Sequence, residues 1–425
     1  MRNHVDMVVD HVNKNGDSIE EVNEHNRIDK ALYQSDMILS EVQTEEIIQE
    51  IEENAENRAK RQAMNLRRYP KSRWPNKRVY YSYVNASARA VMSFEQAVKD
   101  WSNATCIDFY QNDTGILQAY PKPLQINNAQ KIGVSENPRI IVTSGRGCWS
   151  HVGYIGKKQQ QLSLGRGCGT AKMASQFNKQ SEASNNNYNL TYDYGGVMHY
   201  GPMSVSKNRK PVVITRDINY MPTLGSPMIS FYEKLMMNVH YECNDCTKET
   251  SAACQNGGFP HPRNCMICIC PSGYGGDLCD RRPDGCGSVL KANESFQSLV
   301  DTVGVDTIPP GRVQFYMCHY WIEAQPGEKI EVILDSFSRG FQVEGCKYAG
   351  VEIKTGSDKR YTGYRFCSPS SSGTRLVSTY NVVPIITYNL RRPSTARLRY
   401  RSIRPDTDAL ESTSMPVTST PLPSS

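Results

Sequence analysis

The residues of this chain that could hold a catalytic metal ion are its histidines, and their spacing decides what they can do. They stand at His4, His11, His25, His151, His199, His240, His261 and His319. A zinc site built on one helix needs two histidines four residues apart, with a glutamate between them as general base. No two of these histidines are four residues apart. The sequence therefore offers no local three-imidazole zinc site.

Two short segments nevertheless have the pattern that borders such a site. Gly165-Arg-Gly-Cys-Gly-Thr-Ala171 is a glycine-rich lead-in, and Val197-Met-His-Tyr200 places a methionine and a tyrosine on either side of a histidine. Taken singly, Met198 is ordinary core filler and Tyr200 an ordinary buried tyrosine. Their position directly after Tyr192-Asp-Tyr-Gly-Gly196 resembles the methionine turn that lies beneath the zinc of some metallopeptidases.

Composition excludes several classes of protein. The 425 residues carry a net charge of +6 and have a mean hydropathy of −0.56. No apolar run approaches the roughly 18 residues that a membrane-spanning helix needs. Acidic residues dominate 36–57, and a basic stretch follows at 58–78, which indicates a processing junction rather than a nucleic-acid-binding face. Arg58, Lys60 and Arg61 fit a dibasic processing site, with an ordinary charge cluster as the alternative.

Cysteine usage and glycosylation signals predict secretion. The chain has 14 cysteines, an even number, and they crowd between Cys243 and Cys286, which indicates disulfides formed in an oxidising compartment. N-x-S/T triplets stand at Asn85, Asn103, Asn112, Asn189 and Asn293. The N-terminus has no apolar signal region, so we expect the true start to lie upstream; a form that is not exported is the alternative.

The first two of five predicted segments are 1–61 and 62–243. The first is polar and rich in Asn, Asp and Glu. The second has mixed helix and strand patterns, which predicts an α+β domain. Its expected elements are strands at 79–84 and 139–143, a helix with Phe94, Ala97, Val98 and Trp101 on one face, and a last helix with Ser226 as N-cap and Pro227 in the first turn.

The remaining segments are 244–280, 286–402 and 403–425. The first has too few apolar residues for a core, so three disulfides must hold it. A zinc knuckle at Cys265 and Cys268 is possible in principle, but the Cys-x-Cys step and the turn at 271–276 favour an EGF-like hairpin. Strand-like runs alternating with turns predict a β-sandwich at 286–402, in which Cys286, Cys318, Cys346 and Cys367 pair sequentially in the simplest connectivity. The Ser-, Thr- and Pro-rich tail is predicted to be disordered.

Together these residues resemble the astacin family of secreted zinc metalloendopeptidases, with the nematode-type layout of prodomain, peptidase, EGF-like module and CUB domain. The motifs that carry the resemblance are Gly147-Cys-Trp-Ser-His-Val-Gly153, Gln161-Leu-Ser-Leu-Gly165, the Met198 turn and the segment 217–225. The resemblance implies an astacin-like metzincin domain of α+β type, followed by a disulfide-rich EGF-like module and an all-β CUB sandwich.

The resemblance also implies roles for single residues. Met198 would lie under the metal, and Tyr200 would be a zinc ligand that swings to stabilise the oxyanion. His199 would point away from the metal, and Asp36 would be the prodomain residue that caps zinc in the zymogen. The segment 147–153 would be the cleft-edge strand that receives an extended peptide. The disulfide cysteines would be Cys106 with Cys243 and Cys148 with Cys168 in the peptidase domain, and Cys246, Cys265, Cys254, Cys268, Cys270 and Cys279 in the EGF-like module.

The chain departs from the family at Ala171 and Lys172. In the family, Gly-Thr-Ala continues into the zinc helix, whereas here it joins a later segment, so all three histidines and the glutamate are missing together. A block deletion of this kind indicates a skipped exon or a faulty gene model, and removes the central span of the domain. We therefore expect no bound zinc, with Tyr200 a vestigial ligand, and no hydrolysis.

Three functions follow for such a chain. The first is a secreted metalloendopeptidase family member that acts on extracellular matrix or cuticle proteins but is inactive as written. The second is a non-catalytic extracellular binding protein that uses its EGF-like and CUB modules. The third is a structural matrix component. Asp335 is a conceivable calcium ligand in the CUB-like segment, without a full acidic triad around it.

Overall fold

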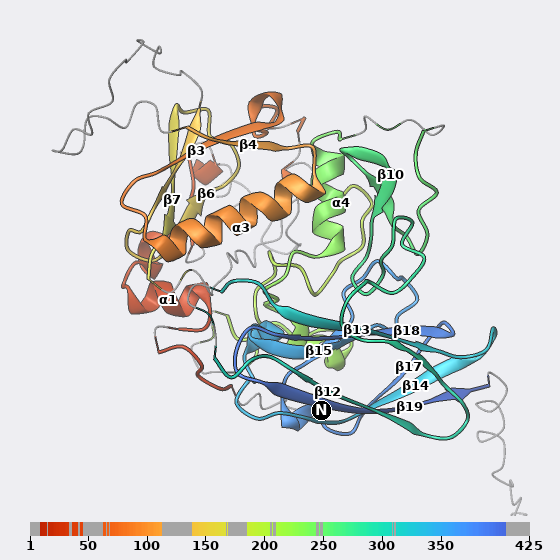
Figure 1. Cartoon of the computed structure of the whole chain (residues 1–425). Coiled ribbons are helices and arrows are strands. Elements are labelled where there is room, and N and C mark those ends of the chain that lie inside the picture. Colours follow the sequence, from red (N-terminus) through yellow and green to blue (C-terminus); the bar gives the residue numbers. More distant parts are fainter. Residues whose placement is uncertain are drawn as a thin grey trace, which may run out of the picture.

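The computed structural model describes residues 9–14, 16–33, 36–40, 43–45, 63–64, 66–67, 69–112, 138–166, 168, 185–204, 206, 210–243, 246, 250–307, 309 and 312–404. We call 9–40 the N-terminal segment, 69–243 the α/β domain, 246–280 the cysteine-rich module and 286–404 the sandwich. Figure 1 shows the α/β domain above the sandwich, with the N-terminal segment and the cysteine-rich module reaching from one to the other on opposite sides. No helix in the described part of the chain is long and apolar enough to cross a membrane.

A six-stranded mixed sheet forms one layer of the α/β domain. Its strands, in spatial order, are β1 (Met37–Ile38), β6 (Cys148–His151), β7 (Gln159–Leu164), β5 (Arg139–Thr143), β3 (Arg78–Tyr83) and β4 (Asp108–Gln111). Only the pair of β6 and β7 is antiparallel. Two predicted strands, 79–84 and 139–143, are confirmed as β3 and β5. The edge strand β1 comes from the N-terminal segment.

Helix α3 (Ala88–Ala104) covers one face of this sheet (Figure 1). It begins at Ser87, whose hydroxyl accepts the Ala90 N–H at 3.3 Å. The predicted apolar face is present: Phe94 is 7% exposed and packs against Tyr81 and Val142 in the sheet core. Burying such aromatic side chains contributes about 25 cal/mol per Å² of apolar surface.

The last helix, α4 (Phe231–His240), begins four residues later than predicted. Its N-cap is Ser230, and Ser230 and Glu233 form a reciprocal capping box. Ser226 is therefore not the N-cap; its hydroxyl instead accepts a hydrogen bond from the guanidinium of Arg365 in the sandwich. The prediction was wrong because a capping box satisfies two helix N–H groups, whereas Pro227 only fits the first-turn geometry.

Several short elements lie outside the six-stranded sheet and its helices. They are α1 (Ile19–His25), β2 (Ala63–Met64), β8 (Asn185–Asn186) and the 3-10 turns η1 (Asp29–Ala31), η2 (Pro75–Lys77) and η3 (Ile218–Thr223). β2 and β8 pair antiparallel.

Disulfides hold the cysteine-rich module, which contains the hairpin of β9 (Phe259–His261) and β10 (Asn264–Ile269). The pairs are Cys246–Cys265, Cys254–Cys268 and Cys270–Cys279. In this arrangement Cys265 and Cys268 are both disulfide-bonded, which contradicts the zinc-knuckle alternative.

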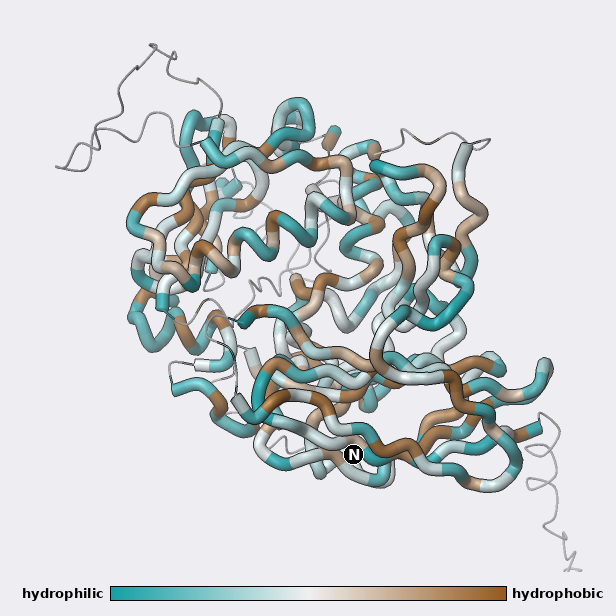
Figure 2. Tube along the Cα trace, viewed as in Figure 1, coloured by the Kyte–Doolittle hydropathy of each residue, from teal (hydrophilic) through white to brown (hydrophobic). Residues whose placement is uncertain are grey.

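The sandwich has two sheets around the largest apolar core of the described chain. The first sheet contains β11 (Val289–Lys291), β13 (Tyr316–Glu323), β18 (Val382–Asn389), β15 (Ala349–Ile353) and β16 (Tyr364–Phe366), and the second contains β12 (Gln297–Val303), β19 (Ser394–Ile403), β14 (Lys329–Phe337) and β17 (Thr374–Val377). The turns η4 (Glu344–Cys346) and η5 (Pro369–Ser371) connect strands. Figure 2 shows hydrophobic stretches along these strands and hydrophilic residues at their turns.

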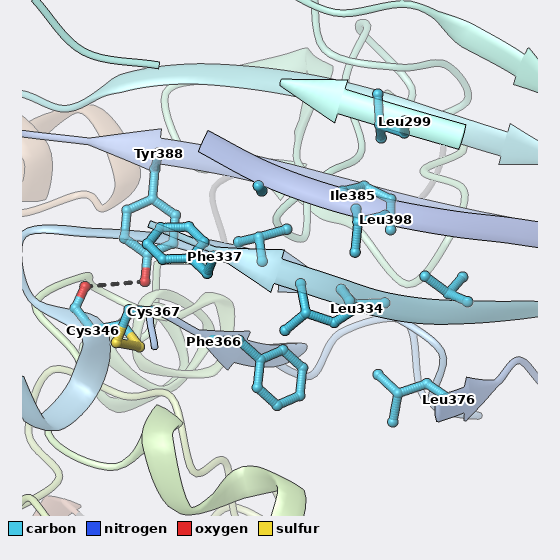
Figure 3. Packing of buried hydrophobic residues seen from close by; sticks show 14 of the residues in the cluster. Leu299, Leu334, Phe337, Cys346, Phe366, Cys367, Leu376, Ile385, Tyr388 and Leu398 are labelled. Atoms are coloured by element: carbon cyan, nitrogen blue, oxygen red, sulfur yellow. Dashed lines mark hydrogen bonds between the residues drawn. A yellow bond between two sulfur atoms is a disulfide. The ribbon is translucent and has the colours of Figure 1, made fainter. Parts of the chain in front are cut away.

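Two disulfides, Cys286–Cys318 and Cys346–Cys367, close the sandwich, in the sequential connectivity. The second lies at one end of the core shown in Figure 3, where the Tyr388 hydroxyl donates to the Cys346 carbonyl oxygen at 3.1 Å. Leu334 and Phe337 fill the space between the two sheets.

Candidate functional site

The Met198 turn is fixed by the first turn of α4. The Glu233 carboxylate accepts the Val197 N–H at 3.0 Å and the Met198 N–H at 2.8 Å, and also accepts the Ser230 N–H at 2.7 Å. One buried carboxylate thus satisfies three backbone donors from two segments. Charge-assisted bonds of this type are roughly twice as strong as neutral ones, so Glu233 sets the position of the turn.

Met198 and Tyr200 have different environments. Tyr200 is 2% exposed, whereas the Met198 side chain is 47% exposed. His199 lies between them, with Nε2 bonded to the Tyr192 hydroxyl and Nδ1 2.7 Å from the Tyr200 carbonyl oxygen. Both ring nitrogens of His199 therefore have partners in nearby residues of the chain.

Two other histidines of the α/β domain have pKa values lowered by burial. His240 Nδ1 is 2.7 Å from the Tyr188 hydroxyl, and burial lowers the pKa of His240 to about 4, assisted by Arg73. His151 lies on β6, where burial lowers its pKa. Among the residues that the structure describes, no three His, Cys, Asp or Glu side chains are grouped so as to hold a metal ion. The donors present there do not fit a three-nitrogen zinc site.

The N-terminal segment occupies the open edge of β6. β1 pairs with β6 in parallel, with Met37 opposite Ser150, and the Ser150 N–H donates to the Asp36 carbonyl oxygen at 3.1 Å. Asp36 is 1% exposed. The strand expected to receive a peptide by strand addition is thus paired with a segment of its own chain.

A second contact fixes the N-terminal segment beside β6. Ile19 and Val22 of α1 pack on the Cys148–Cys168 disulfide, together with Leu164. Figure 1 shows α1 below the sheet at the side of the sandwich. The other disulfide of the domain, Cys106–Cys243, ties the end of α3 to the end of α4.

The same segment also contacts the sandwich. Asp17 accepts the Tyr348 hydroxyl at 2.7 Å, and its carbonyl oxygen accepts Lys347 Nζ at 2.9 Å. The Asp10 N–H donates to the Gln342 carbonyl oxygen at 2.6 Å, and the Gln342 N–H donates to the Asp10 carboxylate at 2.8 Å. The N-terminal segment therefore bridges the α/β domain and the sandwich.

Several predicted sites lie elsewhere. Asn85, Asn103, Asn189 and Asn293 are exposed and Asn112 is half-buried, so the structure leaves these sequons near the surface. Asp335 is bonded through both carboxylate oxygens to Arg399 Nε, at 2.9 and 2.8 Å. Arg58, Lys60, Arg61 and the junction at Ala171 and Lys172 lie outside the described residues.

Sequence reasoning missed two positioning residues, Asn23 and Glu233. The Ser-x-x-Glu spacing of 230–233 is a capping-box signal that could have found Glu233. Asn23 has no such signal, because its partner, the Cys148 backbone, is 125 residues away.

Comparison of the sequence with known proteins identifies related proteins. The family profile of the Astacin peptidases matches residues 66–174 and 169–242, in two parts that meet at 169–174. Zinc metalloproteinase nas-31 of Caenorhabditis elegans is 38% identical over 438 residues, covering 94% of this chain and 68% of the relative. Zinc metalloproteinase nas-23 of the same organism is 30% identical, covering 91% of this chain and 74% of the relative.

A further relative and the solved structures extend the comparison. Zinc metalloproteinase nas-32 of Caenorhabditis elegans is 30% identical, and the chain spans 62% of its length. A solved structure of the MASP-1 CUB2 domain bound to Ca²⁺ is similar with 18% identity and a TM-score of 0.20, covering 28% of this chain and 99% of that one. The CUB1-EGF-CUB2 domains of rat MASP-1 have 20% identity and a TM-score of 0.20, covering 32% and 48%.

The alignment with nas-31 is longer than this chain, 438 residues against 425. The relative therefore has residues inside the aligned span that this chain lacks. With an identity of 38% over 68% of that relative, and the family profile matched on both sides of 169–174, this chain belongs to the astacin family of peptidases.

Proposed function

We propose that this chain is an astacin-family protein that does not bind the catalytic zinc and does not hydrolyse peptide bonds. The observation that carries the proposal is the spacing of the eight histidines, of which no two stand four residues apart. Two findings support it: the family match divides at 169–174, and nas-31 has residues within the aligned span with no counterpart here. The missing block would carry the zinc helix.

The chemical consequence follows from what zinc supplies. In family members it lowers the pKa of its bound water to about 7 and polarises the scissile carbonyl. A glutamate general base then takes the proton of that water. Tyr200 is one phenol in a buried position, and one oxygen donor cannot replace three imidazoles. The Met198 turn and Glu233 would remain as the surroundings of a zinc site whose ligands are missing.

The proposal extends to the layout of the chain. Residues 1–61 would be prodomain-like, 62–243 the truncated peptidase domain, 244–280 an EGF-like module and 286–402 a CUB-like domain. Seven disulfides and the surface-near sequons support a secreted glycoprotein. Its partners would be extracellular or matrix proteins. Processing after Arg61 would separate the prodomain-like part. In that part, Asp36 would be the residue that caps zinc in the zymogens of the family.

The test is zinc content and proteolysis of the full chain, purified from a secretory host. Metal analysis after dialysis against micromolar zinc is expected to find far less than one zinc per chain, and casein is expected to remain intact. The matched control is a chimaera that carries the corresponding block of nas-31 between Ala171 and Lys172. The chimaera is expected to bind one zinc and to cleave casein until a chelator is added. Stoichiometric zinc and chelator-sensitive cleavage by the unmodified chain would refute the proposal.

A further inference from the structure

The outer face of the second sandwich sheet carries a row of arginines. β19 alternates inward apolar residues with outward Arg397, Arg399 and Arg401. Alternate residues of a strand are about 6.6 Å apart and lie on one face. Arg375 on the second neighbouring strand, β17, adds a fourth guanidinium. We call these four arginines and Phe296 the arginine face; in Figure 1 its sheet lies on the side of the sandwich away from the α/β domain.

A buried and a half-buried carboxylate orient three of these four arginines. Glu331, whose side chain is 2% exposed, accepts Nε of Arg375 and Nε of Arg401, the latter at 2.6 Å. Asp335 accepts Nε of Arg399. In Arg399 and Arg401 the bonded nitrogen is Nε, so the terminal Nη groups are available to a ligand. Held side chains lose less conformational entropy on binding than free ones.

An aromatic ring steadies the same row. The guanidinium carbons of Arg399 and Arg401 lie 5.4 and 4.6 Å from the centre of the Phe296 ring. Such cation–π contacts stabilise the orientation of the two guanidinium groups. Phe296 itself is 41% exposed, and Val300, opposite Arg397 on β12, is 51% exposed. The face is therefore partly apolar.

The positive charge of the arginine face indicates the class of ligand that it could bind. The face has four arginines against two carboxylates, which hold three of the four, so it keeps an excess of positive charge. The planar guanidinium binds the oxygens of sulfate or phosphate through paired N–H groups. Disulfide usage points to an oxidising compartment, where sulfated polysaccharides rather than nucleic acids are the abundant linear polyanions.

We propose that the arginine face binds a linear sulfated polysaccharide, with successive sulfate groups taken by Arg397, Arg399 and Arg401. This site is independent of the missing zinc block, because it lies on the sandwich. It would retain the chain on a polyanionic matrix whether or not the α/β domain has any activity.

Heparin is the probe for the test, with the full chain and its binding measured by surface plasmon resonance at several salt concentrations. The test variant is Arg397→Gln with Arg399→Gln, which leaves both partners of the buried Glu331 in place. The matched control is Arg89→Gln with Arg166→Gln, two exposed arginines of the α/β domain, which removes the same charge. The test variant is expected to bind at least about tenfold more weakly, and the control within about twofold of the unmodified chain.

Two further measurements distinguish specific binding at the arginine face from a general effect of positive charge. Arg399→Lys keeps the charge but loses the planar fork, and is expected to bind with intermediate affinity. Desulfated heparin and a DNA duplex of equal length are expected to bind at least about tenfold more weakly than heparin. Equal loss in the test and control variants, no binding by the unmodified chain, or equal binding of DNA would each overturn the proposal. Removal of N-glycans before a repeat shows whether a glycan at the neighbouring Asn293 screens the face; the ranking of the variants is expected to stay unchanged.

Discussion

The side-chain amide of Asn23 forms two hydrogen bonds with the backbone of Cys148. Its Nδ2 donates to the Cys148 carbonyl oxygen at 2.7 Å, and its Oδ1 accepts the Cys148 N–H at 2.6 Å. Asn23 is fully buried, and Cys148 begins β6. The amide thus pairs with the backbone as a neighbouring strand would, two residues ahead of the part of β6 that β1 covers.

Replacing Asn23 by alanine is expected to loosen the N-terminal segment. Asn23→Ala leaves the buried N–H and C=O of Cys148 without partners, at about 1–3 kcal/mol each. Amide hydrogen exchange over residues 16–33 is expected to quicken by at least about tenfold. The control is Glu24→Ala, a neighbouring exposed position on α1. Equal exchange in both variants would show that the segment is held without this pair.

Glu233→Gln is expected to destabilise the α/β domain. One amide oxygen cannot accept the N–H groups of Val197, Met198 and Ser230 as a carboxylate does, so we expect a loss on the order of 2–3 kcal/mol in the free energy of unfolding. Urea denaturation measures it. Glu242→Gln is the control, because Glu242 is exposed and its ion pair with Arg73 is worth roughly 0–1 kcal/mol. A loss no larger than that of the control would contradict the anchoring role of Glu233.

Stability is expected to fall as pH rises from about 4.5 to about 7, through Glu344. Burial raises the pKa of Glu344 to about 7, with Glu20 and Glu21 of α1 adding to the rise and Lys347 and the Met203 N–H opposing it. The folded state therefore holds a proton that the unfolded state has lost, so this contribution is present below pH 4.5 and lost above 7.

Glu344→Gln tests that pH dependence. Glutamine cannot ionise, so the variant is expected to show a flatter stability profile between pH 4.5 and 7 and a higher melting temperature than the unmodified chain at pH 8. Differential scanning calorimetry across this range gives the comparison. Parallel profiles for the two proteins would rule out Glu344 as the titrating group.

Breaking the buried ion pair of Arg365 and Glu352 is expected to be costly. Their side chains are 3% and 2% exposed, with Nε and Oε2 at 2.8 Å, and the Arg365 N–H donates to Thr223 of the α/β domain at 3.0 Å. Arg365→Met leaves a buried carboxylate unpaired and is expected to cost about 3–5 kcal/mol. The double variant with Glu352→Gln removes that charge and is expected to lose less. A double-mutant cycle in urea measures both, and strict additivity of the two substitutions would contradict this account.

Local patterns predicted much of this fold because local chemistry decides those parts. The β-branched run at 139–143 becomes β5, and the amphipathic stretch with Phe94 becomes part of α3. The clustered cysteines likewise indicate disulfides, since few apolar residues between 246 and 280 could otherwise hold a core.

What the sequence could not predict depends on contacts between distant residues. Asp17 and Tyr348 are 331 residues apart, and Asn23 and Cys148 are 125 apart. A short polar side chain that bonds a remote backbone leaves no periodic signal along the chain. The start of α4 was misplaced for a different reason: the Ser-x-x-Glu signal at 230–233 is local, but Ser226 followed by Pro227 offered a competing first turn.

The pairing of β1 with β6 has a consequence for solubility. An uncovered sheet edge presents a row of unsatisfied N–H and C=O groups, which templates association with other chains. Because β1 belongs to the N-terminal segment, a chain that loses that segment gains such an edge and becomes prone to self-association. The N-terminal segment thus covers part of a strand edge that other chains could otherwise pair with.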